Sequence, residues 1–227
     1  IFESIAQALT LDGTELAVDG VLLIGEHGEY AWNEKGQHLY PRRYFFEQVC
    51  GVIAASGRSV PIFSDKHLAW NWDSAKWMYD RAKTLGVPFM AGSSLPVSYR
   101  NPGLEYELET AVTEAVSMAY GGLDSYGFHA LETLQCMVER RSGGETGIRA
   151  VQHYAGDAVW QAGDDGVWSW DLLAAAMSRS DSPQGNAIED GRPEDIVGLG
   201  YIRDHVPDPA AYVIEYSDGL RATMLLL

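Results

Sequence analysis

Asp65, Lys66 and His67 place a carboxylate, an amine and an imidazole on three consecutive residues, directly after a short apolar run. The pKa of an ammonium group falls when the group is partly desolvated beside an imidazole, and it then approaches the range useful for general acid or base work. Lys66 is therefore the first candidate for a catalytic group, with Asp65 beside it. The alternative is a structural lysine whose ammonium pairs with Asp65 or with a helix carbonyl.

A second candidate is His129, which follows Gly127 where a helix is expected to begin. Its imidazole would share or relay a proton with Lys66 if the two segments face each other across a crevice. Glu132 lies one helical turn further on the same face, where its carboxylate would orient the imidazole or reach a ligand. The alternatives are a satisfied core histidine and a plain structural hydrogen bond.

A different set consists of His27, Asp65 and His67, with Glu26 nearby. Two imidazoles and a carboxylate suit zinc, iron or manganese, and the loops after neighbouring parallel strands can converge. These residues lack a tight sequence spacing, so a divalent metal is the less favoured interpretation. With a metal, the protein would be a non-redox enzyme such as a lyase, isomerase or hydrolase, and a further alternative is an inert oligomeric binding protein. The simpler alternative is hydrogen bonding to a substrate or to loop backbone.

Alternating strands and helices are expected to position the first and third of these sets. The runs that predict these elements are strands at 18–24, 59–63 and 87–91 and helices from Pro41 to Gly57 and from Asp73 to Leu85. This alternation is typical of parallel βαβ units, and the strand at 18–24 suits burial on both faces.

Ligands of such sheets bind beyond the carboxyl ends of the strands. The segments 25–28, 64–67 and 92–96 are therefore expected to line one crevice. Ser93 and Ser94 lie in the third segment, where hydroxyl and backbone groups would contact a substrate.

The pattern changes after Pro96, and a domain boundary is expected near residues 97–110. Residues 1–97 are assigned to the rear half of a Rossmann-like domain and 98–227 to a C-terminal domain. The features predicted in the second domain are strands at 115–120, 148–154 and 211–216, a helix at 128–140, a hairpin at Asp218-Gly219 and a surface loop at 179–195. The expected class is α/β, with a partial Rossmann-like parallel sheet followed by an α+β domain that has a mainly antiparallel sheet.

Three segments in this order resemble the glucose-fructose oxidoreductase and inositol dehydrogenase-like family (Gfo/Idh/MocA). Val18-Asp19-Gly20-Val21-Leu22-Leu23-Ile24 resembles the family's fourth strand. Residues 58–96, with Asp65-Lys66-His67, resemble its Glu-Lys-Pro segment and the helix and strand that follow. Gly121-Gly122 through Gly127-Phe128-His129 to Glu132 resembles its Gly-Gly, then Asp-x-Gly-x-His-x-x-Asp stretch. Together the segments span about residues 1–140.

The resemblance implies oxidation of a sugar, cyclitol or related hydroxyl compound with NAD or NADP, and it implies that Lys66 and His129 lie near the reacting hydroxyl. Gly25, Glu26 and His27 would lie beside the cofactor. The residues expected to contact the substrate are His67, Ser93, Ser94, Ser125 and Glu132.

The sequence departs from the family pattern at several of these positions. Asp65 stands where the family has Glu, His67 where it has Pro, and Ser125 where it has Asp. Glu26 and His27 replace small, uncharged residues, and a carboxylate there is unfavourable next to an anionic cofactor. No glycine-rich phosphate loop precedes residue 18, and the chain opens without Met, so we expect a fragment or a processed product.

The composition of the chain limits the kinds of partner that it can bind. A formal net charge of -16 disfavours binding to nucleic acid or to anionic lipid, and no apolar run approaches the roughly 18 residues of a membrane span. Cys50 and Cys136 are expected to be buried, reduced thiols. We expect a cytoplasmic protein that acts on a small molecule and forms a homo-oligomer through its C-terminal sheet.

Overall fold

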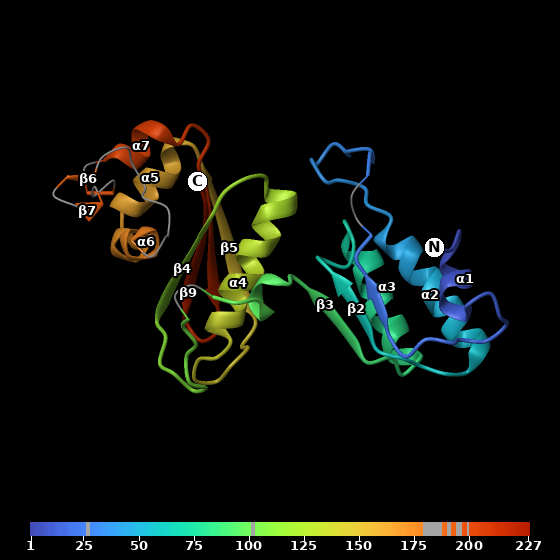
Figure 1. The fold of residues 1–227 in the computed structure, drawn as a ribbon. Helices are drawn as coiled ribbons and strands as arrows, with labels where there is room; N and C mark the ends of the chain where they lie inside the picture. The colour runs from blue at the N-terminus through green and yellow to red at the C-terminus, as the bar shows by residue number, and fades with distance from the viewer. Residues whose placement is uncertain (26–27, 101–102, 179–187, 190–191, 194–196, 199) are drawn as a thin grey trace. The chain divides into compact units, whose positions relative to one another are not determined.

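The computed structural model of this protein describes residues 1–25, 28–100, 103–178, 188–189, 192–193, 197–198 and 200–227. The chain separates into two compact units, Ile1–Ser94 and Leu95–Leu227, which are called unit 1 and unit 2 below. Figure 1 labels the elements of each unit. The fold class expected from the sequence is confirmed: a three-stranded parallel sheet is followed by a four-stranded, mainly antiparallel one.

Unit 1 is built on a parallel sheet with strand order β1-β2-β3. Its elements are α1 (Ile5–Thr10), β1 (Val21–Leu23), α2 (Arg42–Ser56), β2 (Ile62–Asp65), α3 (Trp72–Thr84) and β3 (Phe89–Gly92). Helices α2 and α3 pack against each other and against one face of the sheet. Phe46 and Met78 are fully buried there beside Ile62. This apolar contact is the main source of the unit's stability.

The other face of this sheet differs from expectation. Leu22 pairs in register with Phe63, and Phe63 with Met90, so the three side chains form a row across the sheet. Leu22 is 72% exposed and Met90 65% exposed. Burial of the first strand on both faces was therefore wrong for the described residues, because both crossover helices of unit 1 lie on one side.

The central strand begins and ends later than predicted. The ladder starts where Ile62 pairs with both Val21 and Phe89, and it continues to Asp65 opposite Gly92. Ser64 and Asp65 are thus strand residues and not loop residues, because pairing on both sides extends the strand to its last polar positions. The predicted strand at 87–91 is likewise shifted, since Val87 and Pro88 precede β3.

Unit 2 contains a sheet with strand order β4-β9-β8-β5, in which only the β4–β9 pair is parallel. Its elements are η1 (Leu95–Val97), β4 (Glu114–Ala119), η2 (Leu123–Gly127), α4 (Phe128–Val138), β5 (Ile148–Ala155), α5 (Asp157–Asp164), α6 (Trp170–Met177), β6 (Ile188–Glu189), β7 (Arg192–Pro193), α7 (Tyr201–His205), β8 (Ala210–Tyr216) and β9 (Arg221–Leu226).

Helices cover both faces of this second sheet, with α4 on one side and α5 and α6 on the other (Figure 1). Successive side chains of a strand point to opposite faces, so Met224 joins the core beneath α4 while Leu225 joins the core beneath α5 and α6. The sequence predicted α4 but not α5, α6 or α7. The predicted loop at 179–195 lies largely outside the described residues.

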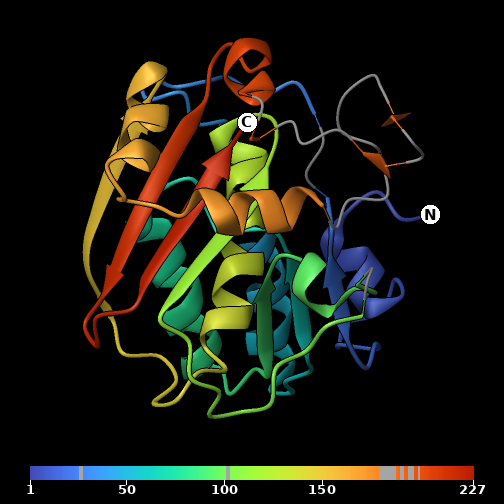
Figure 2. The same cartoon turned by 90° about the vertical axis from the view of Figure 1, so that its left-hand side faces the viewer.

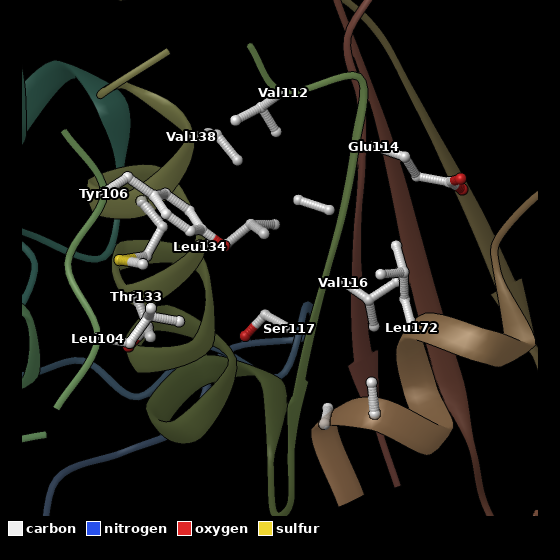
Figure 3. Close-up of a pocket in the computed structure, with 14 residues that line it drawn as sticks. Leu104, Tyr106, Val112, Glu114, Val116, Ser117, Thr133, Leu134, Val138 and Leu172 are labelled. Atoms are coloured by element: carbon white, nitrogen blue, oxygen red, sulfur yellow. The ribbon is translucent and has the colours of Figure 1, made fainter. Parts of the chain in front are cut away.

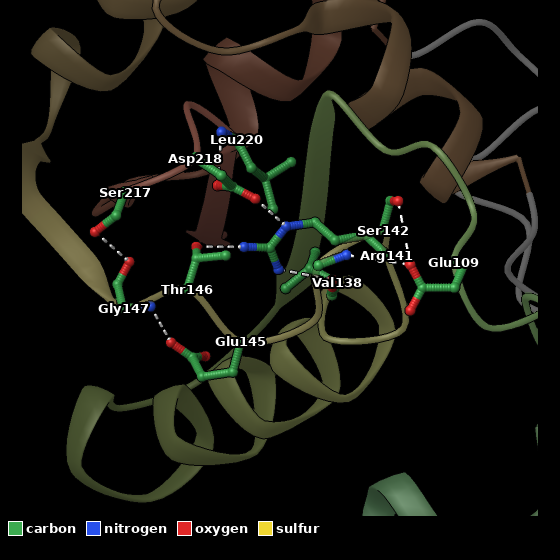
Figure 4. A network of polar contacts seen from close by, with 11 residues as sticks. Glu109, Val138, Arg141, Ser142, Glu145, Thr146, Gly147, Ser217, Asp218 and Leu220 are labelled. Carbon is green, nitrogen blue, oxygen red and sulfur yellow. Dashed lines mark hydrogen bonds and ion pairs between the residues drawn. The ribbon is translucent and has the colours of Figure 1, made fainter.

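The predicted hairpin at Asp218-Gly219 joins β8 to β9, which Figure 2 shows in red. Gly219 adopts a φ of 92°, which a side chain would strain. Arg141, only 2% exposed, donates to the Asp218 carboxylate at 2.7 Å and to the Val138 carbonyl at 2.8 Å (Figure 4). This contact fastens the hairpin to the end of α4.

No helix among the described residues is long and apolar enough to cross a membrane. Cys50 is buried as predicted, and burial raises the pKa of its thiol to about 11. Cys136 differs from expectation because it is only half-buried on α4.

Candidate functional site

The predicted site begins with the last residue of β2. Asp65 Oδ2 accepts a hydrogen bond from Lys66 Nζ at 2.8 Å, and the two side chains are 11% and 23% exposed. The pairing of Lys66 with Asp65 that the sequence left open as an alternative is thus present. It does not exclude a chemical role, because the ammonium remains partly accessible at the carboxyl edge of the parallel sheet.

Lys66 has an unusual backbone. Its φ is 69°, in the left-handed region that residues other than glycine rarely adopt. Its N–H donates to the Gly92 carbonyl at 2.9 Å, which ties the end of β2 to the end of β3. Strained residues of this kind cost about 1–3 kcal/mol and cluster at functional sites, where surrounding contacts hold them in place.

His67 lies against a buried cation that sequence reasoning missed. Arg42, the first residue of α2, is 4% exposed, and its Nη1 lies 2.9 Å from His67 Nε2. The Arg42 guanidinium also lies over the Tyr40 ring, 4.4 Å from its centroid. Two consecutive arginines at the start of a helix, where the dipole disfavours positive charge, were the sequence signal that something holds one of them there.

The segment 28–40 contains a cluster of aromatic rings, and its Tyr40 contacts Arg42. His38 stacks on Trp32 with ring centroids 4.3 Å apart, and it lies 4.2 Å from the Tyr40 ring. Gln37 Nε2 donates to the Trp70 carbonyl at 2.8 Å, which joins this segment to the residues after His67. The segment therefore packs beside the polar residues at the end of β2.

The residues predicted to lie beside a cofactor or substrate in unit 1 are placed as follows. Gly25 follows β1 and is exposed, whereas Glu26 and His27 lie outside the described residues. Ser93 is buried and Ser94 is half-buried, directly after β3. The ends of β2 and β3, at Asp65 and Gly92, are brought together by the strand register.

This edge has unfilled hydrogen-bonding capacity. Ser64 Oγ and Asp65 Oδ1 are buried and have no hydrogen-bond partner within the part of the chain that the structure describes. Buried polar atoms without partners are rare, and they are often satisfied by a bound ligand. A ligand that offers N–H or O–H donors suits these two oxygens.

The predicted residues of unit 2 lie around the start of α4. Here η2 is a single turn of π-helix, in which the Gly127 N–H donates to the Gly122 carbonyl five residues earlier, at 3.3 Å. Such turns are frequent at functional sites. Ser125 lies in this turn and is exposed, while His129 and Glu132 are half-buried in the first turns of α4.

Steric constraints explain why glycine occupies two positions of this motif. A Cβ at Gly127 would lie 2.8 Å from Leu123 Cδ1, and Gly121 adopts a φ of 86° with the Tyr126 ring in the space that a Cβ would occupy. The Gly-Gly and Gly-x-His elements therefore shape the chain that leads into α4.

The alternative metal set gains no support from these contacts. Arg42 lies against His67 and Lys66 pairs with Asp65, so two of its three residues contact cations, which is unfavourable for a divalent ion. No group of three or more His, Cys, Asp or Glu in the described ranges is arranged to hold a metal. His27 lies outside those ranges.

Unit 2 also contains a cavity of about 340 Å³ that the sequence did not indicate (Figure 3). It lies between α4, β4 and α6, with Leu134, Val116 and Leu172 on its walls and Tyr106 at one side. Ser117 and Thr133, two of its hydroxyl-bearing residues, donate to backbone carbonyls of α4. Its lining is mostly apolar, and Glu114, a charged residue of that lining, pairs with Arg221.

No protein-family model and no curated protein matches this sequence. Solved structures do match over nearly the whole chain. The gentamicin A biosynthesis protein GenD2, in complex with NAD, is 16% identical with a TM-score of 0.49, and the match covers 99% of this chain and 51% of that one. UDP-N-acetylglucosamine 3-dehydrogenase GnnA from Acidithiobacillus ferrooxidans is 13% identical with a TM-score of 0.47, covering 99% and 53%.

Biliverdin reductase from Synechocystis, in complex with biliverdin and NADP+, is 12% identical with a TM-score of 0.44, covering 99% of this chain and 56% of that one. The chain spans about half the length of these structures. Of these three proteins, the first binds NAD, the second is a dehydrogenase and the third is a reductase with bound NADP+. Likeness at this identity concerns the fold.

Proposed function

We propose that this protein is a nicotinamide-dependent oxidoreductase that acts on a hydroxyl group of a sugar, cyclitol or similar polyhydroxylated small molecule. The observation that carries the proposal is Lys66, held by Asp65 in a strained backbone conformation at the carboxyl edge of a parallel sheet. Together with the order of the three family-like segments, this placement favours the oxidoreductase interpretation over an inert binding protein.

The residues at this edge fit a nicotinamide group. Gly25 and Gly92 present no side chains there, and the buried oxygens of Ser64 and Asp65 have capacity for donors. Gly25, Ser93 and Ser94 are the described residues that we assign to cofactor and substrate contacts, with Glu26 and His27 assigned from the sequence alone. When bound, a nicotinamide supplies hydride acceptance and donation.

Lys66 would hold the proton of the substrate hydroxyl. An ammonium has no lone pair for this proton, so Lys66 would accept it as a neutral amine, with Asp65 Oδ2 2.8 Å from Nζ to fix the position of that nitrogen. General acid–base assistance of this kind contributes about 10²–10⁴-fold to a rate. We assign His129, with Glu132 one turn away, to proton relay in the same reaction on the strength of its motif.

The test measures reduction of NAD+ and NADP+ by absorbance with a panel of sugars, cyclitols and hydroxy acids. Lys66→Met should lower turnover by about 10²–10⁴-fold. Lys76→Met is the matched control, because Lys76 is an exposed lysine of α3 that pairs only with the exposed Asp80 in the contacts described. Turnover that survives Lys66→Met, or no turnover with any of these compounds, would contradict the proposal.

We further propose that the protein acts in the cytoplasm as a homo-oligomer assembled through the C-terminal sheet. Two free cysteines are consistent with a reducing compartment. The edge strand β5 exposes Ile148 and Val151, and an edge with exposed apolar residues favours pairing with another chain. Light scattering of the wild type and of Val151→Lys measures this state, and the substitution should dissociate the oligomer.

A further inference from the structure

Arg42 occupies a position that is unfavourable for a cation unless its contacts compensate. It is the first residue of α2, at the positive end of the helix dipole, and it is 4% exposed. Burial of an uncompensated guanidinium is costly. Contacts that help to offset this cost include the Tyr40 ring, whose centroid lies 4.4 Å from the guanidinium carbon, and His67 Nε2, which lies 2.9 Å from Nη1.

The hydrogen bond to His67 has only one possible direction. A guanidinium group donates and cannot accept, and it does not lose its proton in proteins. His67 Nε2 must therefore be the acceptor, which requires a neutral imidazole with its proton on Nδ1. Arg42 from α2 is a charged group in contact with this ring, and Asp65 and Lys66, which precede His67 in the sequence, bond to each other.

The same contact constrains the backbone of Lys66. Lys66 lies between Asp65, whose register is fixed in the sheet, and His67, whose ring is fixed by Arg42. Its own N–H is bound to the Gly92 carbonyl. The strained φ of 69° at Lys66 is thus bracketed by anchors on both sides.

We propose that Arg42 is a positioning residue, which holds His67 as a neutral, Nδ1-protonated imidazole and thereby keeps Lys66 oriented. The role in catalysis rests on the proposed function. The tautomer of His67 and its hydrogen bond with Arg42 do not depend on the proposed function. At this position the family that the motifs resemble has Pro, so the Arg42–His67 pair belongs to this chain's own version of the turn.

The experiment is nitrogen NMR of the histidine side chains of the intact protein, at a pH where the imidazoles are neutral. The sequence contains six histidines, and the His67 resonances are identified by their loss in His67→Gln. In the wild type we expect Nδ1 of His67 to carry the proton and Nε2 to show the shift of an unprotonated acceptor. In Arg42→Met, the proton should move at least partly to Nε2.

Two further variants make the outcome specific. Arg43→Met is the matched control, because Arg43 is the next residue of α2 but pairs with Glu47 and packs on Trp77, so His67 should keep its tautomer. Arg42→Lys retains a donor and a charge and should preserve the acceptor state of Nε2. If Arg42→Met does not fold, the wild type and Arg42→Lys still decide the result.

A wild-type His67 that carries its proton on Nε2, or an Arg42→Met spectrum identical to the wild type, would overturn the inference. Failure of the proposed function is separate, because it would appear as loss of nicotinamide binding in a protein whose His67 still shows the Nδ1-protonated tautomer.

Discussion

Lys66 combines two costs in one residue, a left-handed backbone and a partly buried ammonium. Neither is needed to build the sheet, since β2 is complete at Asp65. Glycine would adopt this backbone without strain. A lysine retained there is most simply explained by what its side chain does.

Replacing Lys66 by Gly and by Ala separates the backbone cost from the loss of the side chain. Both variants lack the ammonium, but only Ala keeps a Cβ at a φ of 69°. We expect Lys66→Gly to be more stable than Lys66→Ala by about 1 kcal/mol in the free energy of unfolding, measured in urea. Equal stability of the two variants would show that the backbone there is not strained.

The sequence revealed those contacts of the site that join neighbouring residues. Asp65 and Lys66 are neighbours, so their pairing was visible as an alternative from the start. Arg42 lies 25 residues before His67, and only the packing of α2 brings its guanidinium to that ring. Contacts of this kind depend on how side chains fill the space between elements, which no spacing rule encodes.

At the scale of elements, the entrance to α4 depends on glycines for steric reasons. Gly127 is buried, and a Cβ there would lie 2.8 Å from Leu123 and 3.6 Å from Leu226. The turn of π-helix that precedes α4 places these atoms together. The Gly-x-His pattern is therefore a packing requirement, whatever the role of His129.

Gly127→Ala should destabilise the protein by about 1–3 kcal/mol, because the added methyl group overpacks this turn. Gly51→Ala is the matched control. Gly51 lies in α2 with nothing within 4 Å of the Cβ position, so the same change should stabilise by about 0.5–1 kcal/mol through helix propensity. Thermal unfolding of both variants measures the contrast, and a Gly127→Ala protein as stable as the wild type would refute the steric argument.

The hairpin that closes the second sheet carries a pH-dependent contact. A hydrogen bond from Arg141 lowers the pKa of the Asp218 carboxyl from 3.8 to about 2. A depressed folded-state pKa contributes stability that is complete above the ordinary value and is lost as the pH falls through the lowered one. The contact therefore stabilises at neutral pH and fades between pH 3.8 and about 2.

Asp218→Asn should lower the unfolding temperature at neutral pH, and its difference from the wild type should shrink as the pH approaches 2. Asp208→Asn, which removes an exposed carboxylate, serves as the control and should change little. A deficit of Asp218→Asn that persists unchanged at low pH would mean that the ion pair with Arg141 is not its cause.

The sequence predicted those elements whose signals lie within a few neighbouring residues or in a long apolar repeat. The Asp218-Gly219 turn is encoded by two residues, and the helices α2, α3 and α4 by long apolar periods. Helices α5 and α6 are short, and within α5 the Trp168 and Trp170 rings leave no room for a Cβ at Gly163. Packing of those indoles sustains two helices that their own sequences signal weakly.

For the whole molecule, net charge limits the kinds of partner that the protein can bind. With 32 acidic and 16 basic side chains, its field repels polyanions. Arg42 and Lys66 are two of these basic side chains, and both lie near the end of β2, where Lys66 bonds to Asp65.

The fold class, the order of elements in unit 1 and the mainly antiparallel second sheet were all predictable, because hydrophobic periodicity and turn residues encode them. The open face of the first sheet was not. Leu22 and Met90 have the composition of buried strand residues, and only the arrangement of helices shows that one face stays exposed in the described structure.

The most direct test of the account is a fluorescence titration of the protein with NADH and NADPH. We predict saturable binding of at least one of them. A polyhydroxylated substrate analogue or the substitution Lys66→Met should weaken this binding, whereas Lys76→Met should leave it unchanged. Absence of saturable binding of either nucleotide would contradict a nicotinamide-dependent oxidoreductase built around Lys66.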